Sequence, residues 1–368
     1  MPRYEWSAIY DPTGSANALS NIQNVTIQKG RVQVTDPFKA GTATISGRDV
    51  STLPTIEIGG EISIKVDEAA YVSPVEMFYG VVADVQIVYG VVASMDTWTI
   101  YCEDSLATAG RSLTTNSFSW SAGISPYTAG SQVMTNAFSG AVTLAGGSFT
   151  TSMVSAQSRP STNVLQLLNE LAATEQGYLS SQQPNSIKWL NRSEYATNAS
   201  LGDFTDGTIA TTNTIAKFND VTFRSQADSF FDRVVVEPDG LAAQSTGTGS
   251  RVYTVKTYDQ TTTQAKSLAD YLLATLQVQQ SVPSTISALS ESQTTNLVVT
   301  CFQRTAQGNR VRLLLRGVAY DLFLEGAAIT ATPDQTRFTF NVVSASAFNF
   351  FILNNAVFGV LNTSKLGF

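Results

Sequence analysis

Apolar and polar residues alternate along most of the chain. Successive side chains of a β-strand point to opposite faces, so this period of two predicts strands with one buried face and one polar face. Such strands are typical of antiparallel sheets. The clearest runs are Ile56, Ile58, Ile62, Ile64 and Val66, interrupted by a turn or bulge at Gly59-Gly60; Val311, Leu313 and Leu315; and Phe338, Phe340 and Val342.

Two segments follow a helical period instead. Residues 161–176 carry apolar residues at helical spacing, with Ser161 or Thr162 as N-cap and Gly177 as the stop. Residues 261–279 have the same pattern and are followed by Pro283. Shorter helices are expected near 105–109 and 131–138. The polar faces of the long helices are not basic, which favours a helix that covers a sheet over one that lies on a membrane.

The chain is therefore expected to be mainly β with a few helices, in several modules. We predict a first β-barrel module over 1–105, an intervening α+β module over 106–215, a second β-barrel module over 216–345 and a C-terminal arm over 346–368. Residues 60–100 and 308–340 share an order of turn, strand, aromatic-and-glycine strand and aromatic strand. Two copies of one barrel and two unrelated meanders explain this similarity equally well.

Composition adds a bias toward assembly. Charged residues make up only 14% of the chain, against about 25% in ordinary soluble domains. Few charges mean a small desolvation penalty at large interfaces. The net charge of −7 disfavours nucleic-acid binding. The longest basic feature, Arg310, Arg312 and Arg316, alternates along one strand.

The sequence offers little for catalysis. It contains no histidine, which excludes Ser-His-Asp and Cys-His nucleophiles and HExxH zinc sites. Cys102 and Cys301 each fall in a strand-like run and are expected to be buried free thiols. Residues 203–207 lack the ligand spacing of a calcium loop and predict a turn. We therefore expect no catalytic, cofactor-binding or metal-binding residues, no cofactor and no enzymatic activity.

Membrane segments are not expected either. The first residues have no apolar leader, and no stretch reaches the length of a membrane span.

The C-terminal arm is the most apolar part, with five phenylalanines within residues 348–368. It either packs into its own domain or docks on a neighbouring subunit, and we favour docking. The candidate interface residues are Phe350, Phe351, Phe358 and Phe368.

Three stretches resemble the tail hub and minor tail proteins of siphophages, the baseplate-hub-like family. In the first, a Gly-Arg turn precedes an F-x-AGTA strand and a G-x-V-x-D strand follows. The order of these stretches along the chain carries the resemblance. They are Gly30-Arg31, Phe38-Lys39-Ala40-Gly41-Thr42-Ala43 and Gly80-Val81-Val82-Ala83-Asp84; Asp232 to Val236 with the helix at 261–279; and Ile329 to Thr336 with Val357 to Phe368.

The resemblance implies two tail-tube-like barrels per chain and a homotrimer that forms a six-fold-like ring around a DNA channel. The neighbours would be the tail tube, the distal tail protein and the fibres or tip protein. The chain would be made in the host cytoplasm and leave in the virion. The channel wall is expected to be acidic or neutral, so that DNA passes without specific binding. Two rival hypotheses are a receptor- or carbohydrate-binding tail protein and a polysaccharide-degrading tail enzyme.

Overall fold

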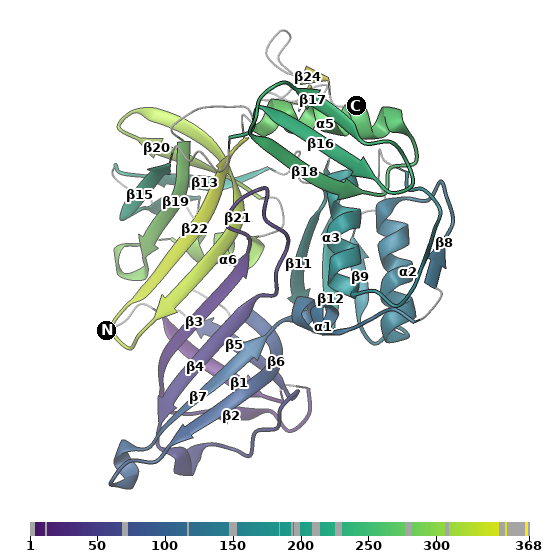
Figure 1. Cartoon of the computed structure of the whole chain (residues 1–368). Coiled ribbons are helices and arrows are strands. Elements are labelled where there is room, and N and C mark those ends of the chain that lie inside the picture. Colours follow the sequence, from purple (N-terminus) through teal and green to yellow (C-terminus); the bar gives the residue numbers. More distant parts are fainter. Residues whose placement is uncertain are drawn as a thin grey trace.

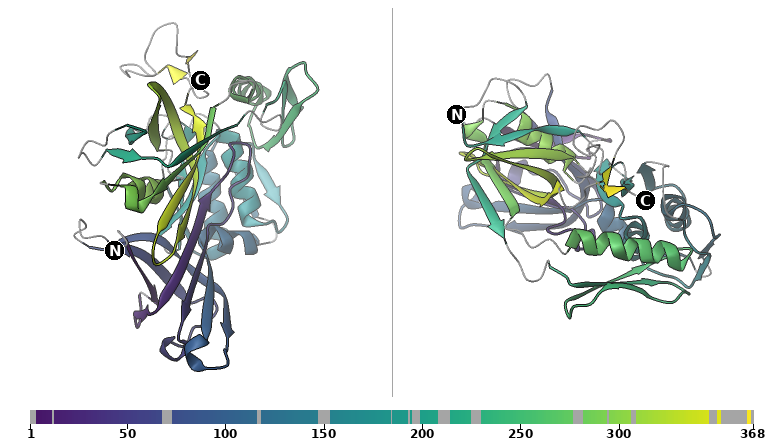
Figure 2. Two further views of the ribbon diagram at one scale, coloured as in Figure 1. Left: turned by 90° about the vertical axis from the view of Figure 1, so that its left-hand side faces the viewer. Right: turned by 90° about the horizontal axis from the view of Figure 1, so that it is seen from above.

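The computed structural model is mainly β with a few helices, as predicted. The molecule is elongated, with strands of the N-terminal residues at one end and helix α5 at the other (Figures 1 and 2). The structure describes residues 4–11, 13–67, 73–115, 118–146, 153–183, 185–192, 194, 199–207, 214–224, 230–276, 282–293, 295–305, 309–345, 350–351 and 365–366.

One large sheet of 14 strands contains strands of both expected β modules. Strand β3 of the N-terminal part pairs antiparallel with β21 of the C-terminal part, so that Ile27 lies opposite Ile329. Among the described residues no sheet closes into a barrel. The strands are β1 (Glu5–Tyr10), β2 (Asn17–Leu19), β3 (Ile22–Gly30), β4 (Thr42–Arg48), β5 (Glu61–Asp67), β6 (Val75–Val88), β7 (Thr97–Glu103), β13 (Ser200–Thr205), β14 (Ile215–Lys217), β15 (Asp220–Arg224), β19 (Val282–Leu289), β20 (Arg310–Leu315), β21 (Val318–Ala331) and β22 (Thr336–Ser344).

The repeated order in the sequence corresponds to two antiparallel meanders. Strands β5, β6 and β7 are paired consecutively, and so are β20, β21 and β22. The middle strand of each meander spans 14 residues and contains a bulge.

One detail of the predicted strand pattern from Ile56 to Val66 was wrong. Strand β5 begins only at Glu61, and Ile58 lies in a turn with 64% of its surface exposed. The turn at Gly59 interrupts the alternation, so Ile58 lies outside the strand.

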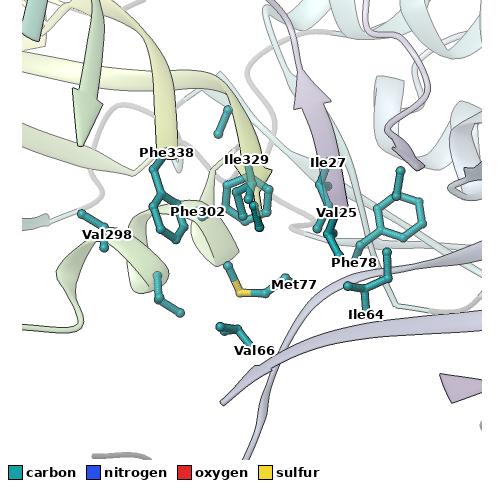
Figure 3. Packing of buried hydrophobic residues seen from close by; sticks show 14 of the residues in the cluster. Val25, Ile27, Ile64, Val66, Met77, Phe78, Val298, Phe302, Ile329 and Phe338 are labelled. Atoms are coloured by element: carbon teal, nitrogen blue, oxygen red, sulfur yellow. The ribbon is translucent and has the colours of Figure 1, made fainter. Parts of the chain in front are cut away.

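A shared apolar core joins the two meanders. Figure 3 shows residues of both chain halves in contact within it, among them Ile27 and Met77 from one half and Phe302 and Phe338 from the other. All four are less than 5% exposed. Burial of this kind stabilises by about 1.5–3 kcal/mol for each large side chain, so the two β modules form one body.

Helix α6 (Leu297–Arg304) lies in this shared core and corrects a prediction. The run that contains Cys301 was expected to be a strand, because Leu297, Val299 and Cys301 are two residues apart. Cys301 instead follows Leu297 by four residues on one helix face, and Phe302 follows Val298 in the same way. In a run this short, both periods fit an apolar segment. Both cysteines are free and buried, as expected.

The intervening module contains three helices and two small sheets, one of three strands and one of two. Helix α3 confirms the predicted helix at 161–176, but its N-cap is Asn163, whose side chain accepts a hydrogen bond from Gln166 N, rather than Ser161 or Thr162. The helix ends at Gln176, in the left-handed region (φ 55°). The elements of this module are α1 (Ser105–Arg111), β8 (Phe118–Trp120), α2 (Pro126–Phe138), β9 (Thr143–Gly146), β10 (Gln157–Arg159), α3 (Val164–Glu175), β11 (Tyr178–Gln183) and β12 (Ser186–Leu190).

The predicted helix at 261–279 is α5 (Thr262–Leu276), and it covers a separate three-stranded sheet rather than the 14-stranded one. Its apolar face, including Leu268 and Leu272, packs on Val234 and Val236. Figure 1 shows this unit beside the intervening module at the upper end of the molecule. Its strands are β16 (Arg233–Pro238), β17 (Gln244–Gly247) and β18 (Val252–Thr257).

Little of the C-terminal arm is described. Two short strands, β23 (Phe350–Phe351) and β24 (Lys365–Leu366), pair in parallel. Phe358 and Phe368 lie outside the described residues. The proposed role of these four phenylalanines at an interface therefore stays a prediction.

The described residues also contain three short 3₁₀ turns: η1 (Val50–Thr52), η2 (Ala93–Met95) and η4 (Ser290–Ser292).

Candidate functional site

The loop between β3 and β4 forms the junction of the modules. At its start, Arg31 Nε lies 2.6 Å from Glu325 Oε2 of β21. The arginine side chain is 12% exposed and the glutamate 1%. The other end of the guanidinium donates to Val34 O at 2.8 Å. A charge pair this well buried is costly to separate, so Arg31 fixes the loop to the sheet.

Aromatic rings enclose the same guanidinium. Its carbon lies 4.6 Å from the ring centroid of Phe38 and 5.1 Å from that of Tyr178 on β11, within the range of cation–π attraction. The two rings meet edge to face with centroids 4.7 Å apart. The Tyr178 hydroxyl donates to the backbone carbonyl of Glu325, and burial raises the pKa of this phenol. Arg31 thus contacts the loop, the sheet and the intervening module.

Glycines make the close approach at this junction feasible. Gly30 has a φ of +76°, and a Cβ at this position would lie 2.3 Å from Glu325 O. Gly326, on the facing strand, leaves similar room for Arg31 O. A left-handed backbone with no space for a side chain requires glycine. The Gly-Arg turn of the sequence motif is therefore the point where β3 and β21 meet the loop.

A second pair of opposite charges, the half-buried Lys29 and the buried Asp104, lies near the first. Lys29 of β3 and Asp104, which precedes α1, interact electrostatically; burial lowers the pKa of Lys29 to about 7 and raises that of Asp104 to about 7. Asp104 also caps α1 by accepting from Leu106 N at 3.0 Å. The Lys29 ammonium lies 4.2 Å from the Phe302 ring centroid. A Cβ on Gly41 would lie 2.6 Å from Asp104 Oδ2, which explains the glycine of the F-x-AGTA motif.

A cavity of about 230 Å³ opens beside Arg31 and Phe38. It is smaller than most ligand sites, which occupy about 300–1,000 Å³. The two acids in its wall have other partners: Glu170 accepts from the Tyr258 hydroxyl, and Asp36 accepts from Gln33 N at 3.0 Å. Arg192 lies 4.9 Å from the Tyr271 ring centroid. The arrangement is that of a packed junction.

Two arginines of β20 lie beside carboxylates of the chain. Arg312 forms a fork with both carboxylate oxygens of Asp203, and Arg310 lies 3.9 Å from Asp321. Arg316 lies in the turn after β20, where its backbone N–H donates to Asp206 at 2.9 Å. Asp203 thus faces an arginine side chain and Asp206 faces a backbone N–H, and Arg310 and Arg312 lie beside acids rather than in a purely basic patch.

Sites for metal or thiol chemistry are not found in the part of the chain that the structure describes. It holds no group of three or more His, Cys, Asp or Glu side chains placed to bind a metal ion. Burial raises the pKa of Cys102 to about 12 and that of Cys301 further, so both thiols stay protonated at neutral pH. None of the described helices is long and apolar enough to span a bilayer.

The junction residues were only partly foreseeable. Gly30, Arg31, Phe38 and Gly41 belong to motifs of the sequence, but their partners were missed. Glu325 gave a usable signal, because a carboxylate in the apolar run Leu322 to Ile329 requires a buried positive partner. Asp104, Lys29 and Tyr178 gave no such signal, since pairing across distant segments depends on the tertiary fold.

Comparison with known proteins shows a shared fold without close sequence relatives. No protein-family model and no curated protein matches the chain. A tail protein from Neisseria meningitidis MC58 superposes with a TM-score of 0.63 at 11% identity, over 92% of this chain and 96% of that one. The 43 kDa tail protein of prophage MuSo2 from Shewanella oneidensis gives 0.60 at 10% identity, over 93% and 98%.

A third tail protein has the same fold. Prophage tail protein gp18 from Listeria monocytogenes EGD-e gives a TM-score of 0.51 at 11% identity, over 92% of this chain and 94% of that one. These likenesses run from end to end of both chains, so the whole arrangement of modules is shared. The resemblance to phage tail proteins that the motifs indicated is confirmed at the level of the fold.

Proposed function

We propose that the chain is a structural protein of a bacteriophage tail, placed at the tail tip, where copies form a ring that continues the tail tube. The observation that carries this proposal is the end-to-end likeness of fold to three tail proteins. A shared fold alone does not assign a function. Here the low charge content and the rigid junction agree with a role in assembly.

The ring is proposed to be a homotrimer around a DNA channel. Its neighbours would be the tail tube, the distal tail protein and the fibres or tip protein. The acids that face Arg310 and Arg312 support passage of DNA without specific binding, because an arginine held by a carboxylate has little left for phosphate. The chain would be made in the host cytoplasm and leave it in the virion.

The rival hypotheses find no specific support. A polysaccharide-degrading enzyme needs two carboxylates about 5–9 Å apart that are free to act on a sugar, and the two in the junction cavity have other partners. A carbohydrate-binding protein needs exposed aromatic rings along a groove. The rings of Phe38 and Tyr178 at the junction cavity are buried, and the exposed Tyr89 does not line this cavity. We therefore propose a structural role without enzymatic activity.

Cryo-electron microscopy of assembled tails tests this proposal. We expect three copies in a closed ring at the distal end of the tube, with an inner wall free of Lys and Arg clusters. Particles from a phage that lacks the gene serve as control and should lose this density. A copy found only on a side fibre, or a ring with a basic channel wall, would contradict the proposal.

The C-terminal arm is proposed to dock on another chain during assembly. Five phenylalanines within 21 residues exceed the apolar surface that monomers usually expose. Deletion of residues 350–368 is expected to leave the circular dichroism and melting of the purified chain within a few degrees of the full-length protein, and to abolish its incorporation into tails. Normal incorporation of the deleted chain would end this idea.

A further inference from the structure

The outer half of strand β6 has an open edge. Strand β5 pairs with β6 only as far as Val81, and Gly59 and Gly60 complete the pairing at Val82. Residues 83–88 pair with β7 on one side. On the other side, no strand in the described part of the chain pairs with them. An edge of this kind presents backbone N–H and C=O groups to another chain.

The direction of the backbone groups follows from one hydrogen bond. Val85 N donates to the carboxylate of Asp84 at 2.8 Å, so this N–H points away from β7. Alternate residues of a strand direct their backbone groups to the same side, and Ile87 therefore faces the open edge as well. Natural edges are protected by charged residues, especially lysine, by proline or by β-bulges. The segment 84–88, Asp-Val-Gln-Ile-Val, has no lysine or proline, and the bulge of β6 and the charge of Asp84 lie at its start, so residues 85–88 carry none of these features.

An apolar tip continues this edge. Beyond Val88, the hairpin exposes 73% of Tyr89, 98% of Val91 and 63% of Met95. From Val85 to Met95 no residue is charged. The tip is ordered by hydrogen bonds from Gly90 N to Asp96 Oδ1 and from Met95 N to Val92 O, each 2.8 Å long. It forms the lower end of the molecule in Figure 1, opposite α5.

The open edge favours a protein over a lipid surface as the partner. Lipid tails cannot satisfy backbone N–H and C=O groups, so insertion of this hairpin would leave the edge residues unpaired. The net charge of −7 also opposes binding to anionic membranes. A second β-strand satisfies the edge and covers the apolar side chains together.

We propose that the free chain forms a two-fold dimer in which the 84–88 segments of two copies pair antiparallel, with Gln86 on the axis. In this register Val85 of each copy lies opposite Ile87 of the other in a hydrogen-bonded pair. The Val85 N–H, which donates to Asp84 in the single chain, then donates to the partner's Ile87 carbonyl instead. Asp84 lies opposite Val88, so the two carboxylates are kept apart. The segment can thus pair with a second copy of itself without two like charges facing each other.

The register also accounts for the exposed Ile58. Pairing must stop after Val88, because Gly60 already occupies the position beside Val82. The tip of one copy then leaves the sheet and covers the turn of the other copy that contains Ile58, which is 64% exposed in the single chain. This contact concerns the chain before it meets other tail proteins. It goes beyond the proposed ring, and neither depends on the other.

Engineered cysteines test the register. Gln86→Cys places two thiols on the axis in a pair that is not hydrogen-bonded, where Cα atoms are about 4.5 Å apart and a disulfide can form. The natural cysteines do not interfere, because both are free and no more than 1% exposed. Under mild oxidation we expect Gln86→Cys to form a linked dimer in most molecules. Asp84→Cys alone should stay unlinked, and a mixture with Val88→Cys should link.

Light scattering tests the contact itself. At micromolar concentration the protein should show twice the 39.4 kDa of one chain. Ile87→Lys should weaken the dimer at least tenfold, whereas Val252→Lys, an exposed valine on β18 with similar exposure, should not. Circular dichroism confirms that both variants are folded.

Three results would overturn the proposal. One is a monomer at all concentrations with no link through Gln86→Cys. Another is a link through Asp84→Cys alone, which requires a different register. The third is binding to phosphatidylglycerol vesicles that Ile87→Lys abolishes while no dimer forms. None of these results bears on the presence of a ring in assembled tails, which microscopy tests separately.

Discussion

Replacement of Arg31 by methionine is expected to lower the free energy of unfolding by about 3–5 kcal/mol. The substitution keeps an aliphatic stem but leaves the carboxylate of Glu325, only 1% exposed, without the charge that lies 2.6 Å from it. It also removes the cation between the rings of Phe38 and Tyr178. Urea denaturation followed by tryptophan fluorescence measures the loss.

A surface pair supplies the matched control. Arg111 also contacts a glutamate, Glu103, but its side chain is 61% exposed. Arg111→Met should therefore cost less than about 1 kcal/mol. The double variant Arg31→Met with Glu325→Leu should recover much of the loss, because it leaves no buried charge uncompensated. Equal losses in Arg31→Met and Arg111→Met would show that the junction does not hold the modules together.

Replacement of Phe302 by alanine is expected to cost about 3–5 kcal/mol. This ring is fully buried on α6 and meets Phe338 edge to face with centroids 6.2 Å apart. Its face also receives the ammonium group of Lys29. Removal leaves a cavity in the core that joins the two meanders (Figure 3), so the whole 14-stranded sheet should lose stability in one transition.

Two further variants separate packing from helix propensity. Arg304→Ala, on the exposed side of the same helix, should stay within about 0.5 kcal/mol of the unchanged protein. Phe302→Leu keeps most of the volume and should lose less than half as much as the alanine variant. Thermal and urea unfolding both report these differences. A loss below about 1 kcal/mol for Phe302→Ala would mean that α6 contributes little to the core.

Local patterns in the sequence were enough for most elements. Helices α3 and α5 could be predicted because contacts between residues three and four apart are made within the helix itself. The strands β20 and β22 followed from their alternation, since one face of each is buried. The absence of histidine excluded whole classes of catalytic site regardless of the fold.

The fold decided what depends on distant partners. The pairing of Ile27 with Ile329, which joins the two β modules into one sheet, leaves no local trace in either strand. The run at α6 fitted a strand as well as a helix, and only the tertiary structure shows a helix with Leu297, Cys301 and Phe302 buried in the core. Ile58 has the apolar character of a core residue, yet the turn at Gly59 carries it to the surface.

The candidate site shows the same division. The sequence singled out Gly30, Arg31, Phe38 and Gly41 only through their resemblance to the opening motifs of tail hub proteins. Only the tertiary structure determined the partners of those motifs. Glu325 lies 294 positions further along the chain than Arg31, and no local rule connects residues so far apart. A buried charge requires a partner, but the packing of the sheet decides which residue provides it.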